Sequence, residues 1–142
     1  MINTYVIHSF FEQYTIAVPF AALLFAIIMK GCIHALKGRF TVGKMLGSGG
    51  MPSAHSTFVV SLATAMGIKY SPESDFFLMS LVFSIIIIYD AMNVRYQAGL
   101  HAKALNELQE KNKEQFNESI GHTPAEAVVG GIIGFFTAVL LL

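Results

Sequence analysis

The sequence predicts an all-α fold, a helical bundle embedded in a membrane, and two observations carry this prediction. Hydrophobic residues make up 54% of the 142 residues and charged residues only 13%, with a mean hydropathy of +0.60. Soluble domains contain about 45–50% apolar and about 25% charged residues. The second observation is that the apolar residues gather in four long stretches. We therefore expect one membrane domain over residues 1–142.

The four apolar stretches are the expected helices of this bundle. They cover, approximately, residues 15–36, 53–68, 76–94 and 125–142. A helix needs about 17–25 residues to cross the hydrocarbon core. The stretch 53–68 is short for a full crossing, so we expect it to be tilted, shielded by its neighbours or only partly inserted.

A polar segment, approximately residues 102–119, separates the third stretch from the fourth. Leu105, Leu108 and Phe116 are spaced among many charged side chains there. Apolar residues on one side of a charged helix are typical of a helix at a membrane surface. We expect one polar helix outside the bilayer.

Charge predicts the orientation and excludes one class of partner. Lys69 is expected on one membrane side and the other eight basic residues on the opposite side, which are Lys30, Lys37, Arg39, Lys44, Arg95, Lys103, Lys111 and Lys113. The positive-inside rule makes the second side cytoplasmic, and we expect the inner (plasma) membrane of a cell. A formal net charge of zero argues against a nucleic-acid partner. The single Cys32 supports neither an internal disulfide nor a cysteine metal site, and the N-terminus does not resemble a removable signal peptide.

A glycine-rich turn over residues 47–56 is the strongest chemical signal in the chain. Gly49 and Gly50 let backbone N–H groups approach an anion, and the helix expected to follow would add its positive N-terminal end. Ser53 can donate to a phosphate oxygen, and His55 can transfer a proton near neutral pH. The same composition is also typical of an ordinary loop between helices with a structural histidine. The topology places this turn, Arg95 and the turn 121–124 on one membrane face.

Three ordered motifs together resemble the divergent branch of the type 2 phosphatidic acid phosphatase superfamily. They are Gly49-Gly50-Met51-Pro52-Ser53-Ala54-His55-Ser56, Asp90-Ala91-Met92-Asn93-Val94-Arg95, and Gly121-His122-Thr123-Pro124-Ala125-Glu126. The resemblance implies a small helical membrane protein. It also implies that a lipid phosphate loses its phosphate through a phosphohistidine intermediate, without a metal or another cofactor.

Two superfamily motifs map onto the first half of the chain. A Lys followed after six residues by Arg-Pro is kept only as Lys30, because Lys37 and Gly38 replace the Arg-Pro pair. The resemblance favours phosphate binding by Lys30, whereas an interfacial anchor is the alternative. Lys37 and Arg39 are candidate head-group contacts. Pro52 to His55 match Pro-Ser-Gly-His, which implies that Ser53 binds phosphate and His55 is the general acid.

The third motif has two candidate histidines. His122 is followed by Glu126 at the distance of one helical turn, where a carboxylate can orient the imidazole, and we prefer His122 as nucleophile. His101 keeps the superfamily spacing from Arg95, but Leu105 stands where an Asp is expected. The residues around His122 also fit a helix start, with Thr123 as N-cap. Both interpretations of His122 can hold together.

Asp90 follows a run of isoleucines, so we expect it to be buried and partnered. Asp90 and Arg95 are five residues apart and would face different sides of a straight helix. Lys30 or His55 is therefore the expected partner of Asp90, and a packing ion pair is the alternative to a catalytic role.

The sequence thus favours a metal-independent membrane phosphatase acting on a lipid phosphate or diphosphate. In this hypothesis His122, His55, Glu126 and Asp90 are catalytic. Phosphate would be held by Lys30, Ser53, Arg95, Gly49 and Gly50. The alternatives are a lipid-phosphate-binding protein without catalysis and a small transporter. A homodimer is also expected, because Gly130, Gly131 and Gly134 give the last helix a small-residue face.

Overall fold

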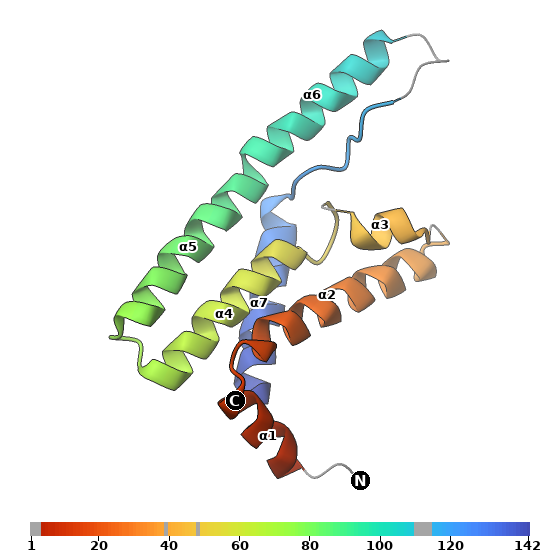
Figure 1. The fold of residues 1–142 in the computed structure, drawn as a ribbon. Helices are drawn as coiled ribbons and strands as arrows, with labels where there is room; N and C mark the ends of the chain where they lie inside the picture. The colour runs from red at the N-terminus through yellow and green to blue at the C-terminus, as the bar shows by residue number, and fades with distance from the viewer. Residues whose placement is uncertain (1–3, 39, 48, 110–114) are drawn as a thin grey trace.

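The computed structural model describes residues 4–38, 40–47, 49–109 and 115–142, and its secondary structure there is entirely helical (Figure 1). The helices are α1 (Thr4–Gln13), α2 (Ala17–Leu36), α3 (Val42–Leu46), α4 (Ala54–Tyr70), α5 (Asp75–Met92), α6 (Val94–Leu108) and α7 (Pro124–Leu141). The predicted all-α class is confirmed. The four apolar stretches correspond to α2, α4, α5 and α7.

Within the described part of the chain, three helical stretches are long and apolar enough to cross a membrane. They are Ala17–Leu36, the α5–α6 rod Asp75–Leu108, and Pro124–Leu141. Helix α4 has only 17 residues and lies at the centre, where it packs against α2, α5 and α7. The short second stretch is therefore shielded by its neighbours.

The interior contains small residues, and the large apolar side chains face outward. Ala22, Ala26 and Ala65 are fully buried, whereas Phe25, Ile86 and many other large side chains are about half exposed or more. This arrangement suits a lipid surrounding, because lipid tails solvate large apolar groups while close helix packing requires small ones. It supports a membrane location independently of composition.

The glycines of α7 are used inside the chain. A Cβ on Gly130 would collide with the Ser53 carbonyl oxygen, and one on Gly134 would collide with the Thr57 carbonyl oxygen. The Thr57 hydroxyl also donates to the Gly130 carbonyl at 2.9 Å. The small-residue face on which the homodimer prediction rested therefore packs against α4 of the same chain, and the homodimer stays a prediction.

Several element boundaries differ from those expected. Helices α1 and α3 were not predicted. The polar helix expected over 102–119 was too long, because α6 begins at Val94 and ends at Leu108, and residues 115–120 are not helical. Residues 110–114, with Lys111 and Lys113, lie outside the described residues, as do Arg39 and Ser48.

The non-helical segment 115–121 lies along α6. The Asn106 side-chain amide donates to the Phe116 carbonyl at 2.9 Å and accepts from the Phe116 N–H at 2.8 Å. The same amide group donates to the Glu118 carboxylate at 2.9 Å. These bonds replace the helical bonds that the sequence pattern suggested, and they lead the chain back toward the start of α7.

The motif-bearing parts of the chain gather at one end of the bundle (Figure 1). This end contains the last turn of α2, helix α3, the first turns of α4 and α7, and the α5–α6 junction. Lys69 lies near the opposite end, where its ammonium donates to the Thr15 hydroxyl at 2.7 Å. The predicted convergence of the three motifs at one end is confirmed.

Candidate active site

His122 is held at the centre of the site by its backbone. Its N–H donates to the Ala91 carbonyl at 3.0 Å, which ties the start of α7 to the end of α5. The preceding Gly121 has φ +115°, and a Cβ there would overlap the backbone of Arg95 and Tyr96. Only glycine fits both this dihedral angle and this close approach. The Gly-His pair of the sequence motif therefore has a steric cause.

Glu126 orients the His122 ring. Its Oε2 lies 3.3 Å from His122 Nδ1 and accepts the Thr123 N–H at 3.0 Å. The Thr123 hydroxyl accepts the Glu126 N–H in return, which completes a capping box at the start of α7. The structure thus shows the expected helix start and the His–Glu contact in the same few residues.

Burial sets the protonation of His122. Its side chain is fully buried, and this desolvation lowers the pKa of His122 below its ordinary value of 6.5. The hydrogen bond and charge of Glu126 oppose this shift but do not reverse it. We assign a neutral imidazole whose Nδ1–H donates to Glu126, so that Nε2 carries the free lone pair.

His55 faces that lone pair. The Nδ1 atom of His55 lies 3.5 Å from Nε2 of His122, and the two rings meet edge to face with centroids 5.7 Å apart. His55 comes from the first turn of α4, whereas His122 precedes α7. The side chains of His55, His122 and Glu126 therefore form one continuous chain of contacts, which we call the His–His–Glu chain.

Lys30 is the buried cation beside this chain. Its side chain is 1% exposed, and its ammonium donates to the carbonyls of Gly47 and Gly49, both at 2.9 Å. It therefore points into the bundle and not toward the membrane interface. The role of the glycine turn as a source of carbonyl acceptors was not predicted from the sequence. The available signal was that a buried ammonium requires hydrogen-bond acceptors.

Ser53 joins the first and third motifs. It is fully buried, its hydroxyl caps α4 by accepting the Ser56 N–H at 3.2 Å, and its own N–H donates to the Glu126 carbonyl at 3.1 Å. The glycine turn before it has Gly50 at φ +87° and Gly49 buried against Ser119 and Gly121. Ser53 and the two glycines thus lie at the site, and phosphate binding by them stays a prediction.

The prediction that Asp90 pairs with Lys30 or His55 was wrong. Asp90 Oδ2 accepts from Arg95 Nε at 2.6 Å, and both side chains are partly exposed, at 39% and 45%. The helix is interrupted at Asn93, between α5 and α6, so the straight-helix geometry that separated the two residues does not apply. Asp90 lies at the end of α5 and not deep in an apolar segment.

The surroundings of His101, the alternative nucleophile, differ from those of His122. His101 is exposed on α6, and Leu105, at the position of the motif's Asp, is also exposed. Among the described residues no group of three or more His, Cys, Asp or Glu side chains is arranged to hold a metal ion. The described contacts therefore single out His122 as the histidine with an orienting carboxylate.

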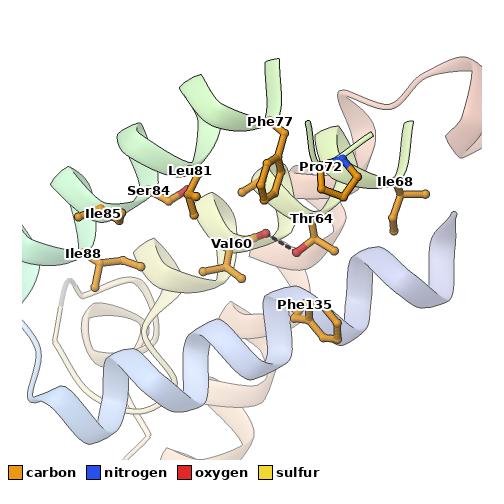
Figure 2. Close-up of a pocket in the computed structure, with 12 residues that line it drawn as sticks. Val60, Thr64, Ile68, Pro72, Phe77, Leu81, Ser84, Ile85, Ile88 and Phe135 are labelled. Atoms are coloured by element: carbon orange, nitrogen blue, oxygen red, sulfur yellow. Dashed lines mark hydrogen bonds between the residues drawn. The ribbon is translucent and has the colours of Figure 1, made fainter. Parts of the chain in front are cut away.

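Two cavities adjoin α4. The first, of about 400 Å³, has Lys30 and His55 in its wall together with apolar residues of α2, α3, α4 and α5. The second, of about 450 Å³, lies between α4, α5 and α7 (Figure 2). Its polar residues include Thr64, whose hydroxyl already donates to the Val60 carbonyl at 2.8 Å, and Ser84. Among the described residues its wall has no titratable side chain, whereas the first cavity contains two of the predicted site residues, Lys30 and His55.

Fold and site together define a class: a helical membrane protein with paired histidines and a buried lysine at one end of its bundle. The chain belongs to the Divergent PAP2 family, whose model matches residues 11–137. It is 29% identical over 140 residues to the uncharacterized membrane protein YuiD of Bacillus subtilis (strain 168), an alignment covering 85% of this chain and 89% of that protein. No solved structure matches the chain significantly.

Proposed function

We propose that this protein is a membrane-embedded phosphatase that cleaves a lipid phosphate or diphosphate through a phosphohistidine at His122. The observation that carries the proposal is the His–His–Glu chain, in which His122 Nε2 is the unprotonated ring nitrogen, beside the buried ammonium of Lys30. Membership of the Divergent PAP2 family supports the same chemistry.

The proposed reaction has two steps. His55 first takes up a proton from solvent. Nε2 of His122 then attacks phosphorus, the bond from phosphorus to the lipid oxygen breaks, and His55 gives that proton to the leaving oxygen. Glu126 holds the Nδ1–H and stabilises the positive charge that the ring acquires. A water molecule then attacks the phosphohistidine, His55 takes up a water proton, and inorganic phosphate leaves.

Cations stabilise the transferring group in this proposal. Phosphoryl transfer is catalysed mainly by positioning and by charge on the phosphoryl oxygens. Lys30 is bonded only to neutral carbonyl groups among the described contacts, so its charge is available to an anion. Arg95 lies at the same end, paired with Asp90. The 3.5 Å contact between the histidines must open to admit phosphorus.

Phosphate release by the purified protein in lipid or detergent tests this proposal. The substrates are phosphatidic acid, phosphatidylglycerophosphate, and polyprenyl phosphates and diphosphates, each with and without a chelator. We expect release that survives the chelator and falls at least a thousandfold in His122→Asn. His101→Asn is the matched control, because it removes the exposed histidine with the same exchange. Full activity in His122→Asn, or loss of activity only in His101→Asn, would contradict the assignment.

Binding without turnover is the second candidate function, and one observation favours it. The His122 side chain is fully buried in this structure, so its Nε2 atom is reached only after the contact with His55 opens. Retained binding of lipid phosphate with no release from any substrate would support this role. A small transporter would instead move its ligand unchanged across sealed vesicles. We further propose that the site faces the cytoplasm across a plasma membrane, because the sequence predicts eight of the nine basic residues on the side of the site.

A further inference from the structure

The cavity beside Lys30 and His55 has an apolar wall that begins immediately next to the polar groups. On α2, Leu23 and Ile27 lie on the same helix face as Lys30, and Ile27 is within one turn of the lysine. On α4, Phe58 and Val59 lie one turn beyond His55. Apart from Lys30 and His55, the described residues in its wall carry no side chain that forms strong hydrogen bonds. We call this cavity the α2–α4 groove.

The α2–α4 groove is limited in length. Phe20 and Phe58 both line it and meet edge to face with ring centroids 5.4 Å apart. Phe20 precedes Lys30 by ten residues, which corresponds to about 15 Å along a helix. The cavity, of about 400 Å³, therefore has Lys30 and Phe20 toward opposite ends of its α2 wall, and Phe58 of α4 packs against Phe20.

This distribution of polarity points to a particular kind of amphiphile. Each ester group of a glycerolipid, placed next to the phosphate, would lose water without gaining a hydrogen bond from this wall, which is unfavourable. An alkyl or prenyl chain attached directly to the phosphate oxygen has no such groups. Its first carbons would lie against Ile27 and Val59 while its phosphate lies against Lys30.

We propose that the α2–α4 groove binds the first section of a single hydrocarbon chain joined directly to phosphate, and so selects alkyl or prenyl phosphates over glycerophospholipids. This inference deepens the proposed function and rests on it for the position of the phosphate at Lys30 and His55. Charge complementarity determines the polar end of the ligand, and the uninterrupted apolar wall determines the character of the adjoining chain.

A tryptophan reporter tests the inference directly, since the chain has no tryptophan of its own. Leu23→Trp places the only indole in the groove. Leu24→Trp, the matched control, places it at an α2 position that is 59% exposed on the outer surface. The probe is dodecylphosphonate with bromine on its chain, because bromine quenches indole fluorescence and the carbon–phosphorus bond is not hydrolysed. Ile27→Trp is the second groove reporter, for use where the first variant does not fold.

We expect saturable quenching of the groove reporter and only weak, non-saturable quenching of Leu24→Trp. Adding Lys30→Gln to the groove reporter should weaken probe binding at least tenfold. A brominated phosphonate analogue of phosphatidic acid should bind at least tenfold more weakly than the dodecyl probe. Equal quenching at both reporter positions, or equal or tighter binding of the glycerolipid analogue, would overturn the inference.

The outcome is separable from that of the phosphatase assay. Selective quenching by the phosphonate in a protein that releases no phosphate would retain the groove and reject the enzyme. Conversely, phosphate release that depends on His122, together with equal quenching at both positions, would retain the enzyme and reject the groove.

Discussion

Replacing Glu126 by Gln isolates the electrostatic role of that carboxylate. Glutamine also serves at this position of a capping box, so α7 should still begin at Pro124. The change removes the negative charge 3.3 Å from His122 Nδ1. With an effective dielectric constant of about 20, two unit charges about 3.3 Å apart attract by about 5 kcal/mol.

The expected loss of transition-state stabilisation is smaller than this attraction, because the Glu126 side chain is 21% exposed and water screens its charge. We take about 3 kcal/mol, which corresponds to a fall in turnover of roughly a hundredfold. The same change should lower the pKa of His122 further, because the hydrogen bond and charge of Glu126 raise it. NMR titration of the His122 ring protons measures this pKa without any need for turnover.

Glu118→Gln is the matched control for this experiment. Glu118 accepts a hydrogen bond from the Asn106 side chain on α6, whereas Glu126 is the carboxylate that contacts His122. Both turnover and the pKa of His122 should therefore stay close to those of the unmodified protein in Glu118→Gln. The reasoning is refuted if Glu126→Gln retains turnover within twofold, or if the pKa of His122 stays constant or rises.

Two further predictions concern stability. A Cβ at Gly134 would press against the Thr57 carbonyl, so Gly134→Ala should destabilise the protein by about 1–3 kcal/mol, whereas Gly131→Ala meets only Val60 at an ordinary 3.6 Å and should leave the melting temperature in detergent unchanged or slightly higher. Burial lowers the pKa of His122 in the folded state, so the unfolded chain binds more protons at pH values near and just below 6.5. The free energy of unfolding should therefore increase as the pH rises toward 6.5 and decrease as the pH drops below 6.5. Denaturant unfolding at several pH values should show this dependence on pH, and His122→Asn should reduce it. An unchanged pH dependence in His122→Asn would contradict this prediction, and equal melting temperatures for the two alanine variants would contradict the first.

Much of the fold was predictable because membrane helices are encoded locally. Long apolar stretches predict spanning helices without any knowledge of their neighbours, and this identified α2, α5 and α7 together with the shorter α4. The polar segment was predicted less well. Its spacing suggested a helix to residue 119, but the Asn106 side chain binds the backbone of Phe116 and holds a non-helical segment along α6 instead.

Part of the candidate site was likewise predictable from local sequence, and part was not. The contact between His122 and Glu126 follows from one helical turn of sequence, and the glycine turn and His55 were identifiable from their residue types. By themselves the residues determined the helical membrane class and which side chains carry chemistry, since both depend on local composition and spacing.

Only the tertiary structure decided which of those groups contact one another. It bonded Lys30 to the carbonyls of Gly47 and Gly49, placed His55 against His122, and paired Asp90 with Arg95 across the break at Asn93. These contacts depend on the packing of α4 against α2 and α7 and on the local break in the helix at Asn93. A linear pattern does not encode such relations, because each contact joins surfaces whose relative position is fixed only when the whole bundle has packed.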